Sequence, residues 1–165
     1  MTLERAYGLT RSQLEVGTVV QNNSRFARYT SMGEHYYFAL PEGPESVEGV
    51  TIQGQTIDEL LQPGAIAGIR QGESQFWPDF EGMAHIKIPG TGDIRLGASF
   101  TDTDAAPQED TANNLGLMLW QRPGRPFVCI EPTVGFGRNE DGQFVNTGLV
   151  IRSYGRVAFS TTIAV

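Results

Sequence analysis

The stretch AHIKIPGTGDIRLGASF, residues 84–100, decides the fold class, because two segments in it alternate between apolar and polar residues. In residues 84–88 apolar side chains stand at every second position, and residues 93–100 place four on one face: Ile94, Leu96, Ala98 and Phe100. Side chains of a β-strand alternate between its two faces, so a period of two predicts strands with one buried face. The stretch therefore favours a β protein over a helical one.

The rest of the chain continues this pattern and leaves few places for a helix. Twenty glycines and nine prolines interrupt any long helical segment and suit turns. We expect one helical turn at residues 56–61, ended by Pro63-Gly64, and a hairpin at Ser153-Tyr154-Gly155 that joins the last two strands. The polar residues 101–114 predict a long exposed loop. Further strands are predicted over residues 14–20, 28–40, 49–53, 115–121, 126–132, 148–153 and 156–165.

Many short strands at this spacing, each with one apolar face, predict an antiparallel β-sandwich. A chain of 165 residues has the size of one compact domain, and it can bury a core without disulfides or metal. No internal repeat is visible in the sequence. We therefore expect a single all-β domain over residues 1–165.

Charge and cysteine content exclude several classes of partner. The net charge of −7 disfavours nucleic acid, whose phosphates require a basic surface. The single cysteine, Cys129, has no internal disulfide partner and lies in an apolar segment, as in proteins of a reducing compartment. Residues 1–5 lack the apolar core of a signal peptide, and no stretch approaches the length of a membrane span. The sequence predicts a soluble cytoplasmic protein without a membrane or nucleic-acid partner.

A carboxylate, Glu131, ends the apolar strand predicted over residues 126–132. Alternation places Phe127 and Cys129 on its face, so apolar neighbours surround it. Burial raises the pKa of a carboxyl group, and a carboxylate in such a place can act as a general base. The alternative is an ion pair between Glu131 and a nearby arginine.

A histidine, His35, lies in an aromatic segment far earlier in the chain and shares its face with Tyr37. Because histidine titrates near neutrality, His35 can act as a general acid beside a ring that stacks on a sugar or packs in the protein. The alternative is a hydrogen-bonded histidine of the core or the surface. Spacing in the sequence does not bring His35 and Glu131 together.

The segment FWPD, residues 76–79, can place the ring of Trp77 and the carboxylate of Asp79 at the rim of a binding site. Packing in the core is the alternative for Trp77, and it is also what we expect of Trp120. The sequence contains no CxxC, HExxH, Walker or GxSxG motif, so it supports no metal site, nucleotide cofactor or serine hydrolase.

Two segments resemble the aldose 1-epimerases, the galactose mutarotase-like proteins. GEHYYFAL, residues 33–40, resembles their Gly-x-His-x-Tyr-Phe-x-Leu segment, and FVCIEP, residues 127–132, resembles their Phe-x-Cys-x-Glu-Pro segment. TVVQNNS, residues 18–24, is similar to the strand that precedes the histidine in that family. The order agrees, and the resemblance runs from about Leu14 to Val165, mainly with the C-terminal half of those proteins.

This resemblance implies a shortened sugar-binding β-sandwich of the supersandwich type that interconverts the anomers of a hexose. The matched His35 would be the general acid and the matched Glu131 the general base of ring opening, without a cofactor. Among the candidate sugar-binding residues, the resemblance suggests Asp79 as the acidic residue that holds hydroxyl groups, whereas Tyr37 and Trp77 are candidates because of their rings.

The chain also departs from the family pattern. Relatives are longer, and their N-terminal portion supplies strands and polar residues that we do not find before Leu14; Thr133 stands where many relatives carry tryptophan. Three hypotheses remain: a mutarotase-like enzyme whose missing wall comes from a second subunit in a homodimer, a non-catalytic carbohydrate-binding sandwich, and a structural sandwich in which His35 and Glu131 only pair with each other.

Overall fold

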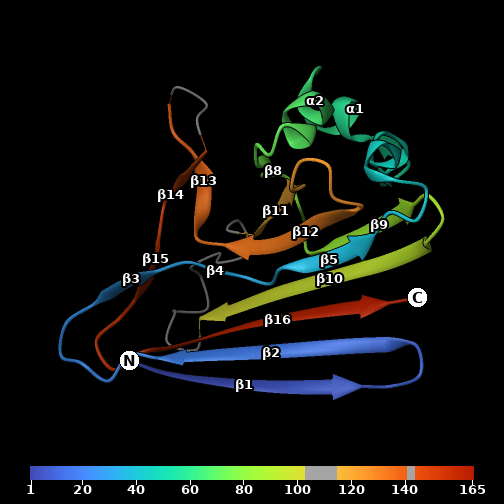
Figure 1. Cartoon of the computed structure of the whole chain (residues 1–165). Helices are drawn as coiled ribbons and strands as arrows, with labels where there is room; N and C mark the ends of the chain where they lie inside the picture. The colour runs from blue at the N-terminus through green and yellow to red at the C-terminus, as the bar shows by residue number, and fades with distance from the viewer. Residues whose placement is uncertain (103–114, 141–143) are drawn as a thin grey trace.

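Four long antiparallel strands dominate the structure, a computed structural model that describes residues 1–102, 115–140 and 144–165 (Figure 1). They belong to a seven-stranded sheet whose first strand has no partner on its outer side within the described residues. Its order is β1 (Thr2–Leu9), β2 (Gln13–Gln21), β16 (Arg156–Ala164), β10 (Gly92–Asp102), β9 (Met83–Ile88), β6 (Thr51–Ile52) and β7 (Gln55–Thr56).

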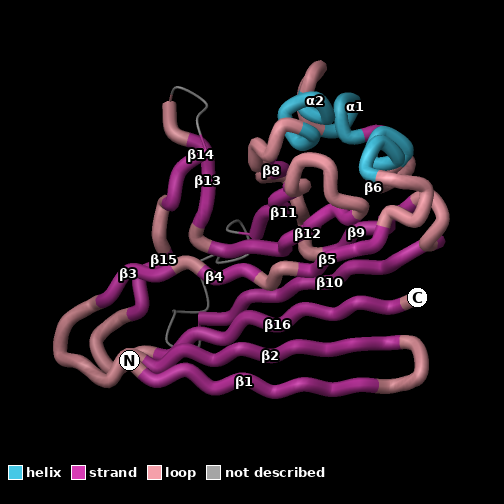
Figure 2. Tube along the Cα trace, viewed as in Figure 1, coloured by secondary structure: helices cyan, strands magenta, loops and turns pink. Residues whose placement is uncertain are grey.

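A second antiparallel sheet packs on the first and is built around β12 (Phe127–Val134). The other strands of this sheet are β4 (Met32–Gly33), β5 (Tyr36–Ala39), β11 (Leu115–Trp120) and β8 (Gln75–Trp77). Two separate strand pairs extend from it, visible in Figure 2: β13 (Phe136–Arg138) with β14 (Phe144–Asn146), and β3 (Arg28–Thr30) with β15 (Leu149–Ile151). The predicted all-β antiparallel sandwich is confirmed.

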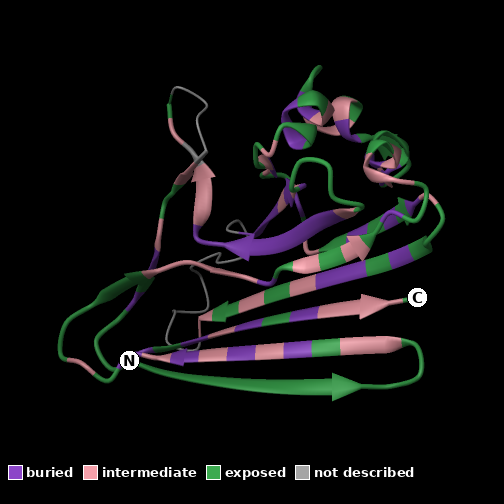
Figure 3. Cartoon of the chain, in the orientation of Figure 1, coloured by how far each residue is buried: buried purple, intermediate pink, exposed green. Residues whose placement is uncertain are grey.

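The main core lies between the two sheets and follows the predicted alternation. Ile86 and Leu96 contribute to it from the long sheet, and Leu117 and Ile130 contribute from the second sheet. All four are almost completely buried, as expected for the apolar faces of a sandwich. Figure 3 shows β12 buried along nearly its whole length, whereas β1 is exposed along all of it.

Three short helices cover one end of this core: η1 (Pro44–Gly49), α1 (Ile57–Leu60) and α2 (Ala65–Arg70). The predicted helical turn is confirmed as α1, which begins with a capping box between Thr56 and Glu59. Helices η1 and α2 were not predicted, because each is a short segment bounded by glycine or proline, without a helical period. Within the described residues, no helix combines the length and the apolarity that crossing a bilayer requires.

The predicted hairpin at residues 153–155 is wrong, although a turn is present there. The amide of Gly155 donates a hydrogen bond of 2.9 Å to the carbonyl oxygen of Arg152, and Tyr154 has a positive φ of 59°. The strands on either side do not pair with each other: β15 pairs with β3, whereas β16 pairs with β2 and β10. The turn therefore passes the chain from a small sheet to the long sheet.

The structure also differs from the sequence-based predictions at three other segments. The single strand predicted over residues 28–40 is divided into β3, β4 and β5, which pair with two different partner strands. Strand β1 was missed because none of its side chains is buried, so it carries no pattern of burial. Of the predicted loop 101–114, Thr101 and Asp102 belong to β10, and residues 103–114 lie outside the described residues.

Candidate functional site

Strand β12 carries Glu131 on the face that points away from the main core. Val128 and Ile130 are fully buried in the core between the sheets, whereas Cys129 and Glu131 stand at the alternate positions. Successive side chains of a strand point to opposite faces, so the thiol and the carboxylate share one face. Glu131 is nevertheless only 5% exposed, because other parts of the chain cover this face.

His35 is part of that cover. It lies in the gap between β4 and β5, and both strands pair with β12, so the gap runs alongside Glu131. The Nδ1 atom of His35 is 3.3 Å from Oε2 of Glu131 and 3.6 Å from Sγ of Cys129. The fold thus brings together two residues that spacing in the sequence alone does not connect.

The two members of this pair differ strongly in exposure. The side chain of His35 is 58% exposed, and that of Glu131 is 7% exposed. Burial raises the pKa of the Glu131 carboxyl; the nearby His35 lowers that pKa, and the carboxylate of Glu34 raises it further, with a net upward shift. Burial, followed by the charge of Glu131, raises the pKa of the Cys129 thiol to about 12. An exposed imidazole therefore contacts a buried carboxyl that holds its proton more tightly than usual.

A pocket of about 290 Å³ opens at this pair. Tyr37 stacks on His35 with a ring-centroid distance of 6.3 Å and an interplanar angle of 15°, as their shared face predicted. Trp120 forms another wall, and its indole nitrogen donates a hydrogen bond of 2.9 Å to the carbonyl oxygen of Gly72. The volume is at the lower end of the range of about 300–1,000 Å³ that small-molecule sites occupy. The pocket lining consists of His35, Tyr37, Ser74, Met118, Trp120, Cys129 and Glu131.

Of the five residues predicted for the site, the structure brings His35, Glu131 and Tyr37 together. Trp77 does not line the pocket: it packs against the main core, with its ring 5.9 Å from that of Phe80. Asp79, in the turn after β8, is exposed and does not line the pocket either.

Trp120, which we expected in the core, lines the pocket. The signal that could have placed it is the alternation of β11, in which the leucines at 115, 117 and 119 are all buried in the core. Met118 and Trp120 occupy the intervening positions and therefore point to the other face. The register of β11 against β12 sets Met118 opposite Glu131 and Trp120 opposite Cys129.

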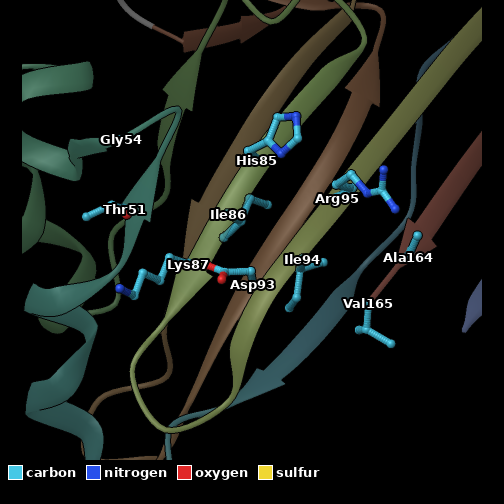
Figure 4. Close-up of a pocket in the computed structure, with 10 residues that line it drawn as sticks. All are labelled: Thr51, Gly54, His85, Ile86, Lys87, Asp93, Ile94, Arg95, Ala164 and Val165. Carbon is cyan, nitrogen blue, oxygen red and sulfur yellow. The ribbon is translucent and has the colours of Figure 1, made fainter.

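A larger hollow of about 540 Å³ lies on the outer face of the long sheet (Figure 4). His85 and Lys87 from β9 and Arg95 from β10 line it, and all three are exposed. No buried carboxylate lines this hollow among the residues that the structure describes. Charges that water screens perturb one another little, so this hollow is less suited to acid–base chemistry than the smaller pocket.

Comparison with known proteins supports the fold. No family model matches the sequence, and the search of curated proteins found no match. The structure is similar to that of a galactose mutarotase related enzyme from Lactobacillus acidophilus, with a TM-score of 0.62 and 14% sequence identity. The matched region covers 98% of this chain and 60% of that chain. It is also similar to a Synechocystis protein, with a TM-score of 0.60, 18% identity and coverage of 98% and 54%.

A third solved structure, a galactose mutarotase-like protein from Clostridium acetobutylicum, gives a TM-score of 0.54 at 15% identity, over 98% of this chain and 54% of that chain. At such identities the likeness concerns the fold and not the activity. This chain spans between 54% and 60% of the length of the three proteins. Over that length it has the galactose mutarotase-like β-sandwich fold.

Proposed function

We propose that this protein is an aldose 1-epimerase-like isomerase that interconverts the α and β anomers of a hexose, with His35 and Glu131 as its acid–base pair. The observation that carries the proposal is the 3.3 Å contact between the exposed imidazole and the buried carboxyl, at the mouth of a pocket. The two oxygen atoms that exchange protons in this reaction are bonded to the same carbon atom of the sugar. A catalytic acid and base must therefore lie close together, as these two side chains do.

The reaction needs only proton transfers. Ionised Glu131 takes the proton of the anomeric hydroxyl, the bond between C1 and the ring oxygen breaks, and protonated His35 gives its proton to that oxygen. The product is the open-chain aldehyde, whose C1–C2 bond rotates before the ring closes on either face. During closure the now protonated Glu131 returns its proton to the new anomeric oxygen, and neutral His35 takes one from the closing hydroxyl. Both groups end in their starting states, so no cofactor is required.

Tyr37 and Trp120 are the proposed walls for the sugar ring. Tyr37 is 58% exposed and already stacks on His35, so its position is partly fixed before a ligand binds. Aromatic rings offer an apolar face to the C–H groups of a sugar and cost little side-chain entropy when they bind.

A homodimer is the proposed source of further cover for the open side of the sandwich. Within the described residues β1 pairs with one strand, β2, and its outer edge is free. Four large apolar side chains are exposed on this segment: Met1, Leu3, Tyr7 and Leu9. A free strand edge with exposed apolar side chains favours pairing with another strand. A second copy supplies a matching strand without any further protein.

The alternative is a carbohydrate-binding protein without turnover. The small volume of the pocket, about 290 Å³, favours it, because a site with few walls binds a sugar weakly and orients it poorly. Under this alternative His35 and Glu131 donate and accept hydrogen bonds with sugar hydroxyl groups and transfer no proton. Both functions place the sugar at the same side chains.

Anomer exchange decides between them. Freshly dissolved α-glucose or α-galactose is followed by polarimetry and NMR with and without protein. The proposed enzyme accelerates the approach to equilibrium, and His35→Ala and Glu131→Gln each lower its rate by about 100- to 10,000-fold. His85→Ala is the matched control, because this exposed histidine lies on β9 and outside the pocket. An unchanged rate with sugar-dependent chemical shifts supports the binding protein, and a lack of both supports a structural ion pair.

The cysteine and the net charge bear on the cellular compartment and the partners of the protein. The single cysteine is buried and free, as is usual where thiols stay reduced, and the acidic net charge of −7 does not favour nucleic acid. We therefore propose a cytoplasmic protein whose partners are a hexose and a second copy of itself.

A further inference from the structure

Three side chains with metal-binding atoms converge in the pocket, although the sequence contains no metal-binding motif. The Nδ1 atom of His35, Sγ of Cys129 and a carboxylate oxygen of Glu131 all lie within 4.8 Å of one another. Two of the three distances are short: Nδ1 of His35 is 3.3 Å from Oε2 of Glu131 and 3.6 Å from Sγ of Cys129. A motif search misses the set because one ligand comes from another part of the chain and the other two are separated by one residue of a strand.

These spacings match the edges of a zinc tetrahedron. Zinc binds nitrogen and carboxylate oxygen at about 2.0–2.2 Å and thiolate sulfur at about 2.3 Å. At tetrahedral angles those bond lengths separate nitrogen from oxygen by about 3.3 Å and nitrogen from sulfur by about 3.6 Å. The two edges that meet at Nδ1 of His35 therefore already have the lengths that a bound zinc ion requires, and the third, between Sγ of Cys129 and the carboxylate of Glu131, is within 4.8 Å.

We propose that His35, Cys129 and Glu131 form a zinc site with three protein ligands and an open fourth position. The mixture of imidazole, thiolate and carboxylate favours Zn²⁺ over Mg²⁺ and Ca²⁺, which prefer oxygen ligands alone. As the S–Zn bond forms, the Cys129 thiol releases its proton to solvent. The fourth position faces the pocket and takes a water molecule.

The structure gives the ion both a rigid site and a way in. Cys129 and Glu131 are held on one face of β12, whose backbone pairs with β11 on one side and with β4 and β5 on the other. His35 is 58% exposed and lies at the mouth of the pocket, so the ion enters from solvent through the same opening as a sugar.

Zinc and proton transfer exclude each other at this pocket. Bound zinc occupies the lone pairs with which His35 and Glu131 would exchange protons, so the ion inhibits the proposed isomerase. Cys129 distinguishes the two uses, because it is a zinc ligand and takes no part in the proposed proton transfers.

The test measures zinc binding in the absence of sugar. Isothermal titration calorimetry with Zn²⁺ gives affinity and stoichiometry, and titration with Co²⁺ gives the sulfur-to-metal charge-transfer absorption of a cysteine ligand. We expect one ion per chain, the thiolate band in the wild type, and a loss of affinity of more than about 100-fold in Cys129→Ala, His35→Ala and Glu131→Gln. His85→Ala, which changes the other histidine, keeps the wild-type affinity.

Folding of each variant is checked by circular dichroism, and Cys129→Ser provides a second variant of similar size if Cys129→Ala does not fold. Wild-type zinc affinity in a folded Cys129 variant, or a cobalt spectrum without the thiolate band, overturns the proposal. The outcome does not depend on the proposed isomerase, since binding is read without sugar. If the isomerase is active, zinc inhibits the wild type, whereas zinc at the same concentration does not lower the rate of folded Cys129→Ala relative to that variant's own rate without zinc.

Discussion

The backbone of Gly33 lies directly against the carboxylate of Glu131. These residues are on neighbouring antiparallel strands, with Gly33 opposite Thr133 in the register of β4 and β12. A Cβ atom at residue 33 would overlap Oε1 of Glu131 and would stand 3.1 Å from Cγ2 of Thr133. The missing side chain of Gly33 therefore provides the space in which Glu131 reaches His35.

Replacing Gly33 by alanine should displace the carboxylate without unfolding the protein. A displacement of about 1 Å in a catalytic group can lower the rate about 100-fold, and we expect a loss of this order in anomer exchange. Gly17→Ala is the control, because the nearest atom to a Cβ at residue 17, Oγ of Ser160, is 3.9 Å away. Full activity in a folded Gly33→Ala variant would contradict the role assigned to this close contact.

The two tryptophans should respond oppositely to substitution by alanine. Trp120→Ala removes a wall of the pocket, so we expect sugar affinity to fall at least about 10-fold, as expected when about 1.4 kcal/mol of contact is lost. Trp77→Ala opens a cavity beside the main core, so we expect the free energy of unfolding to fall by about 3 kcal/mol with little change in sugar affinity. Urea denaturation and NMR titration with a hexose measure the two quantities. Equal losses of affinity in both variants would show that the pocket does not bind the sugar.

The faces of the strands could be predicted from the sequence, but the identity of the pocket wall required the sheet register. Alternation correctly separates Cys129 and Glu131 from their core-facing neighbours on β12, since each strand is buried differently on its two faces. Trp120 becomes a site residue only when β11 is paired with β12, with Trp120 opposite Cys129. The alternation of β11 indicates the face of Trp120, but the position of its ring beside Cys129 depends on this pairing, which no local pattern encodes.

The proximity of His35 to Glu131 could not be predicted from physical pattern alone. It depends on β4 and β5 both pairing with β12, which closes a long loop in sequence, and no local signal encodes that pairing. Only the resemblance to a family connected these two residues beforehand. Strand β1 escaped prediction for the opposite reason: with no buried side chain, it has no periodicity to detect.

Arg5 on β1 pairs with Glu34, whose carboxylate also accepts a hydrogen bond of 3.2 Å from the hydroxyl of Thr18. Glu34 is only 8% exposed, so Arg5→Leu leaves a buried carboxylate without its cation, and we expect the free energy of unfolding to fall by about 1–3 kcal/mol. The double variant Arg5→Leu/Glu34→Gln should recover part of this loss, because the buried charge is gone. Urea denaturation of the three proteins measures both effects. A double variant less stable than Arg5→Leu would contradict this explanation.

The stability of the protein should fall with rising pH through the titration of Glu131. Its pKa is raised above the usual 4.5 by burial, so the native state holds a proton that the unfolded chain has already released. Above pH 4.5 the unfolded state binds fewer protons, and stability decreases until the pH passes the folded-state pKa. We therefore expect Glu131→Gln to be more stable than the wild type at neutral pH, with the difference vanishing at pH values below 4.5. Urea denaturation at a series of pH values would contradict this if the difference did not change with pH.

The free edge of β1 should pair with β1 of a second copy, in an antiparallel register with Ala6 opposite Ala6. This register sets Leu3 against Leu9 and Arg5 against the ring of Tyr7, so no like charges face each other. Ala6→Lys then places two ammonium groups opposite each other at the twofold axis, and we expect it to raise the dimer dissociation constant at least about 10-fold. Sedimentation velocity over a range of protein concentrations measures this constant.

Ser160→Lys is the control for the position of the new charge. Ala6 and Ser160 both stand opposite Gly17, on either side of β2, but Ser160 is not on the free edge. A wild-type protein that stays monomeric at all concentrations would contradict the proposed dimer, and equal dissociation constants for the two variants would place its interface elsewhere than β1.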